Sequence, residues 1–307
     1  MKKILFAVFA LAALASCTNN EVIELNQQAI AFGDVFVDNA TRADYSQAGK
    51  LVGSFKVYGT ANDVLIYNGN AVTRPDAVTS GGAYMDTAWL CDAATQYWVP
   101  NATYNFMAIV DGGESEVDEM PTTIDFTVAD GVNNKDLLLA TASVVVNNAG
   151  TKTGDLSTNS LVAFTFSPLL SKVQFTITEN EPTGYTFDIT SIKATGVQAK
   201  GTYTIGTTIE NGVWAPVAGT PIALEFVNGP LQILPVEQTL EITLTYDIKF
   251  NGTKISSATK SATLNSYDFE ANTAYNVTAT LSLTDQIEFT VNEVDGWTTN
   301  SGDITLQ

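Results

Sequence analysis

The 307 residues suffice for two domains of about 120 to 150 residues, and a hydrophobic share of 45% allows each domain to bury a core. The formal net charge of −19 repels phosphate backbones, so we expect no nucleic-acid partner. The chain contains no histidine, the most common general base and metal ligand, so we expect no enzyme activity, catalytic residue, metal or cofactor.

Residues 1–17 have the organisation of an export signal. Lys2 and Lys3 provide a positive start, and the apolar run at 4–14 is too short to span a bilayer of about 30 Å. The sequence Leu-Ala-Ser-Cys at 14–17 resembles the lipobox of bacterial lipoproteins, in which the cysteine becomes the lipidated N-terminus. The signal therefore predicts a lipid anchor at Cys17 in the outer membrane and a place at the cell surface. An ordinary secretory signal with a chance cysteine is the alternative.

After a polar tether at 18–24, the chain has the pattern of many short strands. The first is predicted at 27–38, with Ile30, Phe32 and Phe36 on one face, and turn-prone residues at 39–44 end it. The pair Asn251-Gly252 between two alternating runs predicts a hairpin. Further strands are predicted at 54–58, 104–109, 123–128, 161–166, 173–177, 189–194, 201–205, 231–234, 241–250, 254–258, 275–283 and 287–291.

This pattern predicts an all-β chain of two β-sandwich domains with Greek-key connections. Residues 147–160 are polar and small, and we place the domain boundary there. The prediction is a tether and first strand over 18–42, an N-terminal sandwich over 43–155 and a C-terminal sandwich over 156–307. No second apolar run reaches 18 residues, so we expect no transmembrane helix in the mature chain.

Few residues suggest a binding or catalytic site. Two acidic loops, at 111–119 and 130–136, have carboxylates that suit a hard cation, but a solvated loop and a turn capped by its own side chains are the favoured interpretations. The aromatic residues Trp89, Tyr97 and Trp98 suit a carbohydrate-stacking platform, although core packing is favoured. With Cys17 lipidated, Cys91 has no disulfide partner, and we expect it to be a buried apolar residue rather than a reactive thiol.

Arginine usage points to one position. The chain has only two arginines, and Arg74 precedes Pro75, a bond that trypsin-like proteases cut poorly. The bond between Arg42 and Ala43 is therefore the only good site for an Arg-specific protease. It lies in a turn-like stretch after the first predicted strand, where proteolytic nicking concentrates. A chance scarcity of arginine in an acidic chain is the alternative.

Six features follow one another along nearly the whole chain, and together they resemble the fimbrillin family, the type V pilus subunits of Bacteroidales. Two details differ from the family pattern: Ser167-Pro168 stands where a histidine is frequent, and Val99 separates Tyr97-Trp98 from Pro100. The six features are the lipobox ending at Cys17; Ile30-Ala31-Phe32 followed by Thr41-Arg42-Ala43; Trp89 followed by Tyr97-Trp98-Val99-Pro100 and the Tyr-Asn-Phe-Met-Ala at 104–108; Lys-Asp-Leu-Leu-Leu-Ala at 135–140; Phe-Thr-Phe at 164–166 with Leu-Ser-Lys-Val at 170–173; and Ile-Glu-Phe-Thr-Val at 287–291 with Trp297.

The resemblance implies a Greek-key-like (transthyretin-like) topology and a route of assembly. A lipoprotein precursor reaches the outer surface, and an Arg-specific protease cuts between Arg42 and Ala43. The released strand, within 27–41, leaves an apolar groove in the N-terminal sandwich. The terminal strand of another copy, or of a related pilus subunit, then fills that groove by β-augmentation.

Two C-terminal segments have the alternation that a donor strand needs. Ile287, Phe289 and Val291 form one apolar face, and Ile304 with Leu306 forms a second. The resemblance thus implies a structural and adhesive pilus subunit, with the choice between stalk and tip left open. The alternative is a surface glycan-binding lipoprotein that does not polymerise. In addition, the Asp-Thr-Ala around Thr87 resembles the O-glycosylation signal of this bacterial group.

Overall fold

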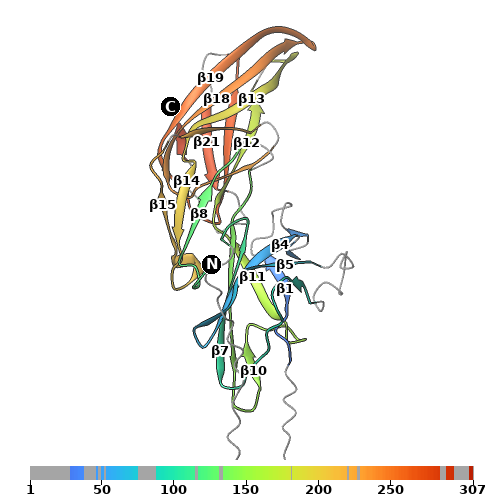
Figure 1. The fold of residues 1–307 in the computed structure, drawn as a ribbon. Coiled ribbons are helices and arrows are strands. Elements are labelled where there is room, and N and C mark those ends of the chain that lie inside the picture. The colour runs from blue at the N-terminus through green and yellow to red at the C-terminus, as the bar shows by residue number, and fades with distance from the viewer. Residues whose placement is uncertain are drawn as a thin grey trace, which may run out of the picture.

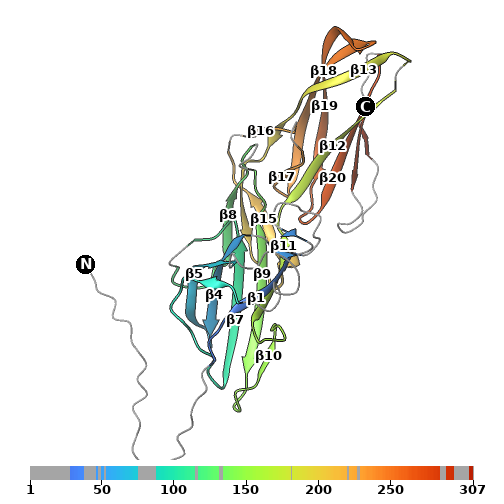
Figure 2. The same ribbon diagram turned by 90° about the vertical axis from the view of Figure 1, so that its right-hand side faces the viewer.

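The predicted all-β class is confirmed by the computed structural model. Among the residues that it describes, the regular elements are strands and one short 3-10 turn, η3 (Ile209–Asn211), and no helix there is long and apolar enough to cross a membrane. The molecule is long, with β7 and β10 towards one end and β13, β18 and β19 at the other (Figures 1 and 2). The structure describes residues 28–37, 46–47, 50–51, 53–74, 88–114, 117–130, 134–180, 182–219, 221–226, 229–283, 288–293 and 304–306.

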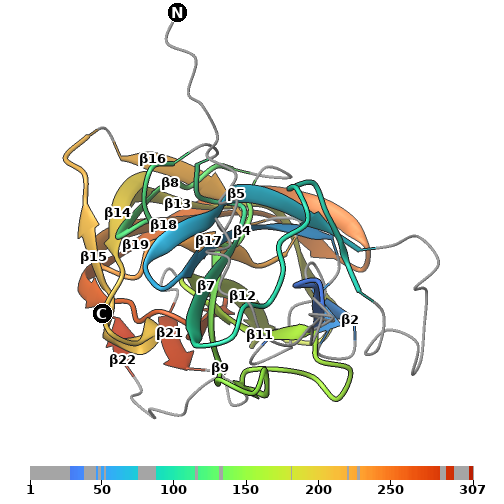
Figure 3. The same ribbon diagram turned by 60° about the horizontal axis from the view of Figure 1, so that its bottom comes forward.

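The first half of the chain forms one large sheet, in the order β2-β3-β1-β11-β9-β7-β4-β5-β6, with β10 beside β9. Seen in Figure 3, the sheet curves from β5 through β4 and β7 to β9. Its strands are β1 (Phe32–Val37), β2 (Ser46–Gln47), β3 (Lys50–Leu51), β4 (Ser54–Ala61), β5 (Val64–Thr73), β6 (Leu90–Cys91), β7 (Ala102–Val110), β9 (Leu138–Val146), β10 (Lys152–Gly154) and β11 (Val162–Pro168).

The second half forms three smaller sheets, in the orders β15-β14-β8, β16-β13-β18-β19 and β17-β12-β20-β21-β22. Their strands are β8 (Thr123–Thr127), β12 (Ser171–Glu179), β13 (Tyr185–Val197), β14 (Lys200–Thr204), β15 (Val213–Pro216), β16 (Ile222–Glu225), β17 (Leu231–Ile233), β18 (Glu237–Phe250), β19 (Thr253–Asp268), β20 (Ala274–Leu281), β21 (Glu288–Glu293) and β22 (Ile304–Leu306). β8 comes from the first half, so this pairing joins the two halves of the chain.

Two apolar cores hold the sheets together. The first is built on the inner face of the curved sheet, around Phe32, Phe106 and Phe164. The second lies among the C-terminal sheets but also includes Tyr58 and Ile109 of the first sheet. β11 pairs with β1 and β9, so the change of sheet comes at residues 169–170, after the predicted boundary. The division into two sandwich domains at 155/156 stays a prediction.

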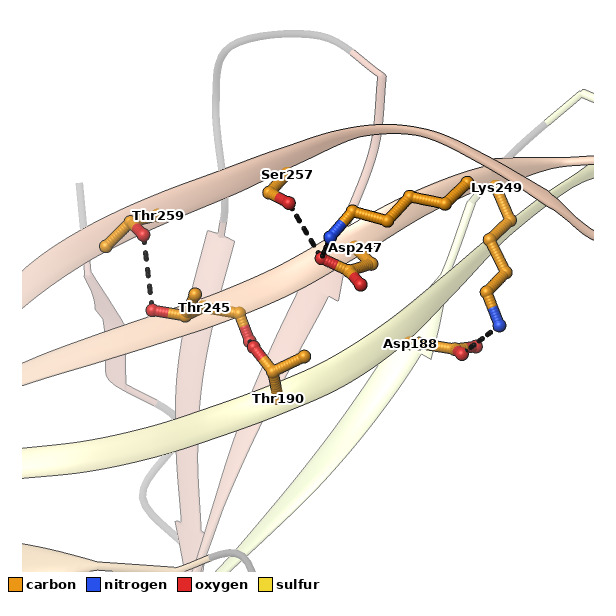
Figure 4. Close-up of polar contacts among 8 residues, drawn as sticks. Asp188, Thr190, Thr245, Asp247, Lys249, Ser257 and Thr259 are labelled. Atoms are coloured by element: carbon orange, nitrogen blue, oxygen red, sulfur yellow. Dashed lines mark hydrogen bonds and ion pairs between the residues drawn. The ribbon is translucent and has the colours of Figure 1, made fainter.

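The longest hairpin is β18–β19, and its predicted turn is confirmed. Asn251 and Gly252 have φ values of 45° and 80°, the left-handed conformation that a tight hairpin turn requires. On the outer face, hydroxyl and carboxylate groups pair across the strands (Figure 4). The oxygen atoms lie 3.2 Å apart for Thr245 and Thr259, and the Ser257 hydroxyl donates to Asp247 at 2.8 Å. Such cross-strand pairs stabilise a solvated sheet face.

Candidate strand-exchange site

The first predicted strand is a buried strand of the first sheet. β1 runs parallel to β11, with Phe32 opposite Val162 and Val37 opposite Phe166. Phe32 and Val37 are buried, as expected of an inner apolar face. The predicted place of Phe36 on that face is wrong: a register shift between Gly33 and Val35 inserts one residue, and Phe36 is partly exposed while Val35 and Val37 are buried.

Phe32 lies at the centre of the first core. Its ring centroid is 5.3 Å from that of Tyr67 and 5.8 Å from that of Phe106, both edge to face, and 6.0 Å from that of Phe164, against which it stacks. Aromatic pairs at these separations add to the stability gained from burial alone. The strand before Arg42 therefore completes the core of a sandwich whose other strands come after Arg42.

Backbone hydrogen bonds hold this segment on the side away from β11. The amide of Ile30 donates to the carbonyl of Gln96 at 2.8 Å, and the amide of Trp89 donates to the carbonyl of Phe32 at 2.8 Å. The amide of Trp98 donates to Gln28 at 3.1 Å. The segment 28–37 thus fills a slot between β11 and the stretch 89–98.

An empty slot would greatly lower the stability of the folded chain. Ile30, Phe32, Val35 and Val37 are all buried. Burial of one such side chain contributes roughly 1.5–3 kcal/mol, so the four together contribute about 6–12 kcal/mol. Removing the strand would also leave the edge of β11 unpaired. A chain that lost residues 28–37 would need another apolar strand in their place.

Several predicted functional residues lie outside the described residues. They are the lipidation residue Cys17, the maturation residues Arg42 and Ala43, Thr87, and the donor candidate Ile287. In the sequence, Arg42 and Ala43 stand between the end of β1 at Val37 and the start of β2 at Ser46.

The two candidate donor segments lie next to each other at the end of a sheet. β21, which contains Phe289, pairs with β20, and Val291 is fully buried in the second core. β22, which contains Ile304 and Leu306, is the outermost described strand and pairs with β21. Releasing β22 breaks a ladder of three residue pairs with β21, whereas releasing β21 breaks a ladder of six pairs with β20 and exposes Val291.

The structure decides between the two interpretations of the aromatic residues. Trp89 and Trp98 are 4% and 5% exposed, and Trp98 packs edge to face on Tyr104 at 4.7 Å, so both belong to the core. Only Tyr97 of the three is exposed. Core packing is confirmed, and the carbohydrate-stacking platform is not formed.

Cys91 is only partly exposed, and burial raises the pKa of its thiol. A raised pKa lowers the fraction of reactive thiolate at neutral pH. The expected full burial of Cys91 is wrong, because the residue is partly exposed, while the raised pKa agrees with the expectation that the thiol is not reactive.

The acidic loops form contacts within the protein. Lys135 pairs with Asp111 at 3.3 Å, which neutralises part of the first loop. In the second, the Asn134 amide donates to the carbonyls of Ala129 and Gln232, which ties this loop to β17. In the part of the chain that the structure describes, no group of three His, Cys, Asp or Glu residues is placed to hold a metal ion.

Sequence analysis missed β5, which supplies Tyr67 against Phe32. Polar Asn68 and Asn70 interrupt its apolar pattern, so the alternation is weak. The signal that marks this strand is the pair Asn62-Asp63, whose φ values of 47° and 64° make the hairpin turn between β4 and β5.

Solved structures share this fold at low identity. A candidate cell adhesion protein from Bacteroides uniformis is 18% identical, with a TM-score of 0.55, over 87% of this chain and 98% of that chain. One from Bacteroides ovatus is 13% identical, with a TM-score of 0.52, over 90% and 99%. One from Parabacteroides distasonis is 9% identical, with a TM-score of 0.51, over 87% and 97%. At these identities the likeness shows the fold alone.

No curated protein matches the chain. The sequence model of the family described as "Fimbrillin-like" matches residues 41–297. The match begins beside Arg42 and extends past β21, so it covers most of the chain. The chain therefore belongs to the fimbrillin-like family.

Proposed function

We propose that this chain is a structural subunit of a surface pilus with a role in adhesion. Membership of the fimbrillin-like family supports this function, and the cell adhesion role given for proteins of the same fold agrees with it. The Leu-Ala-Ser-Cys at 14–17 supports export as a lipoprotein, with Cys17 joined to lipid of the outer membrane before maturation.

The position of β1 is the main observation that supports the proposed assembly route. The strand lies before the cleavage candidate Arg42 in the sequence, yet Phe32 is at the centre of the first core. Cleavage between Arg42 and Ala43 by an Arg-specific protease makes this strand a separate peptide. Its departure opens an apolar slot beside β11, which a strand from another subunit then fills.

The donor strand comes from the C-terminus of a neighbouring copy or a related pilus subunit. Of the two candidate segments, we assign the role to β22, with Ile304 and Leu306, because its ladder with β21 has three residue pairs, whereas the ladder of β21 with β20 has six. Ile287, Phe289 and Val291 remain the second candidate, and their release carries the cost of exposing Val291. A head-to-tail contact that does not close on itself yields a filament.

The alternative of a non-polymerising glycan binder loses its main support. That interpretation depended on an aromatic platform, and two of its three residues, Trp89 and Trp98, are buried. A monomeric binder also has no use for a first strand that a protease can detach.

Two arginine variants test the route. The purified chain, treated with an Arg-specific protease, is expected to form ladders by gel electrophoresis and long polymers by size-exclusion chromatography. Arg42→Ala should stay monomeric, because its slot stays filled. Arg74→Ala is the matched control and should polymerise like the unmodified chain. Ladders from protease-treated Arg42→Ala, or a cleaved chain that stays monomeric, would refute the route.

A further inference from the structure

A cavity of about 840 Å³ lies where β14 and β15 meet the end of β11 and the β18–β19 strands. This volume falls within the range of about 300–1,000 Å³ that is typical of ligand sites. No described lining residue belongs to β1, β21 or β22, so strand exchange removes no part of the cavity.

One side of the cavity is acidic. Glu237 and Asp268 stand directly opposite each other in the β18–β19 ladder, and both line the cavity together with Glu270. Like charges in directly opposite positions of two strands are destabilising. None of the three carboxylates has an ion-pair partner among the described residues, and the described lining includes no lysine or arginine.

The same cavity has a fixed aromatic wall. The indole N–H of Trp214 donates to the carbonyl of Leu169 at 2.9 Å, which sets the orientation of the ring. The ring lies over Gly201, where a Cβ would come within 3.0 Å of the indole, so the glycine makes room for it. Tyr203 supports the ring with a centroid separation of 5.4 Å. An anchored tryptophan in a cavity that is also lined by carboxylates suits a cation.

The segment 268–272, which lines the acidic side of the cavity, is held in place before any ligand enters. The Ser171 hydroxyl donates to the carbonyl of Glu270 at 2.7 Å, and the Glu270 amide donates to the hydroxyl of Tyr275 at 2.8 Å. The side-chain oxygen of Asn272, another lining residue, is buried and accepts no hydrogen bond from the described residues. Because this segment is already ordered, less conformational entropy is lost when a ligand binds.

We propose that this cavity binds a basic peptide segment of a partner protein, with an arginine side chain on Trp214 and its charge among Glu237, Asp268 and Glu270. A guanidinium group stacks on indole and donates charge-assisted hydrogen bonds to carboxylates. A single metal ion does not fit, because the described acids form no metal-binding group. A neutral glycan brings no positive charge to pair with the opposed carboxylates of Glu237 and Asp268. The net charge of −19 attracts a basic partner from a distance.

Calorimetric titration of the purified full-length chain carrying Arg42→Ala, at low salt, tests this site. The probe is a tri-arginine peptide, and the matched neutral probe has citrulline in place of arginine. We expect binding of the arginine peptide, weakened about threefold to tenfold by Glu237→Gln, by Asp268→Asn and by Trp214→Leu. Glu241→Gln, which changes an exposed acid of the same strand outside the cavity, should leave the affinity unchanged.

Thermal melting separates loss of the site from loss of the fold. Glu237→Gln should melt at the same temperature or higher, because one of two opposed charges is gone. The proposal is overturned by equal binding of the citrulline peptide, by equal weakening in Glu241→Gln, or by no binding of the arginine peptide. Binding of a neutral trisaccharide that Trp214→Leu abolishes, with no binding of the peptide, would make the cavity a glycan site instead.

Discussion

Phe32 lies before Arg42, in the part of the chain that the proposed cleavage would detach, and it gives a sharp test at the level of one residue. Phe32→Ala deletes the ring at the centre of the first core, so the uncleaved chain should lose about 3–5 kcal/mol of unfolding free energy. Denaturant unfolding of the precursor measures this loss. Phe36→Ala is the matched control and should cost much less, because Phe36 is partly exposed.

The Phe32→Ala variant should also exchange its first strand for a donor strand faster. After cleavage, the Phe32→Ala and unmodified chains are identical from Ala43 onward, so a difference in polymerisation rate must come from release of the strand. We expect faster ladder formation for Phe32→Ala. Equal stability of the two precursors would show that β1 does not hold the core together.

Cys91 gives a second test at this scale. In a Cys17→Ala chain it is the only thiol, and burial raises its pKa. We expect alkylation by iodoacetamide at pH 7 to be at least about tenfold slower than for free cysteine, and to accelerate as the pH rises through the raised pKa. Alkylation at the rate of free cysteine would show a reactive, exposed thiol.

In the segment 28–37, the sequence identified two of the four buried apolar residues, those before the bulge, and missed the two after it, Val35 and Val37. Ile30 and Phe32 were assigned correctly, because alternation is a local property. Phe36 was assigned to the wrong face, because the bulge at Gly33–Val35 depends on pairing with β11, which is far away in the sequence. Side-chain direction after a bulge cannot be predicted from alternation alone.

At the scale of the element, the two terminal strands are expected to respond in opposite ways. Val291→Asp places a charge in the second core, so the C-terminal sheet should lose at least about 3 kcal/mol and the chain should melt earlier. Ile304→Asp alters the outermost strand and should leave the melting temperature of the precursor nearly unchanged while it blocks ladders. Thermal melting and electrophoresis of both variants measure the difference. An Ile304→Asp chain that still forms ladders would move the donor role to β21.

The elements that the sequence predicted best are those with local signals. Asn251-Gly252 identified the β18–β19 turn, and β18 alternates apolar and polar residues as predicted. β19 is much longer than the predicted 254–258, because its hydroxyl-rich sequence has few apolar residues to alternate with them. The parallel pairs β1–β11 and β12–β20 had no local signal, since their partners are separated by many residues. The sequence therefore predicted the separate segments of the candidate site. The slot that they form between β11 and residues 89–98 could be recognised only in the structure.

At the scale of the whole molecule, the second core and one strand ladder connect the two halves of the chain. Tyr58 and Ile109 of the first sheet pack in the same core as the C-terminal sheets, and β8 pairs with β14. The two halves are therefore joined by side-chain packing and by a strand ladder as well as by the chain itself. The sequence predicted two sandwiches from strand number and spacing, but this connection depends on contacts between distant residues.

The assembly route is tested most directly by mixing a chain that can only donate with one that can only accept. The donor carries Arg42→Ala, so its slot stays filled, and the acceptor lacks residues 301–307 and is cleaved after Arg42. Thermal melting of each chain before mixing confirms that it is folded. Light scattering during size-exclusion chromatography should show monomers for each chain alone and a one-to-one complex on mixing. Two monomers that elute separately after mixing would contradict strand exchange between subunits.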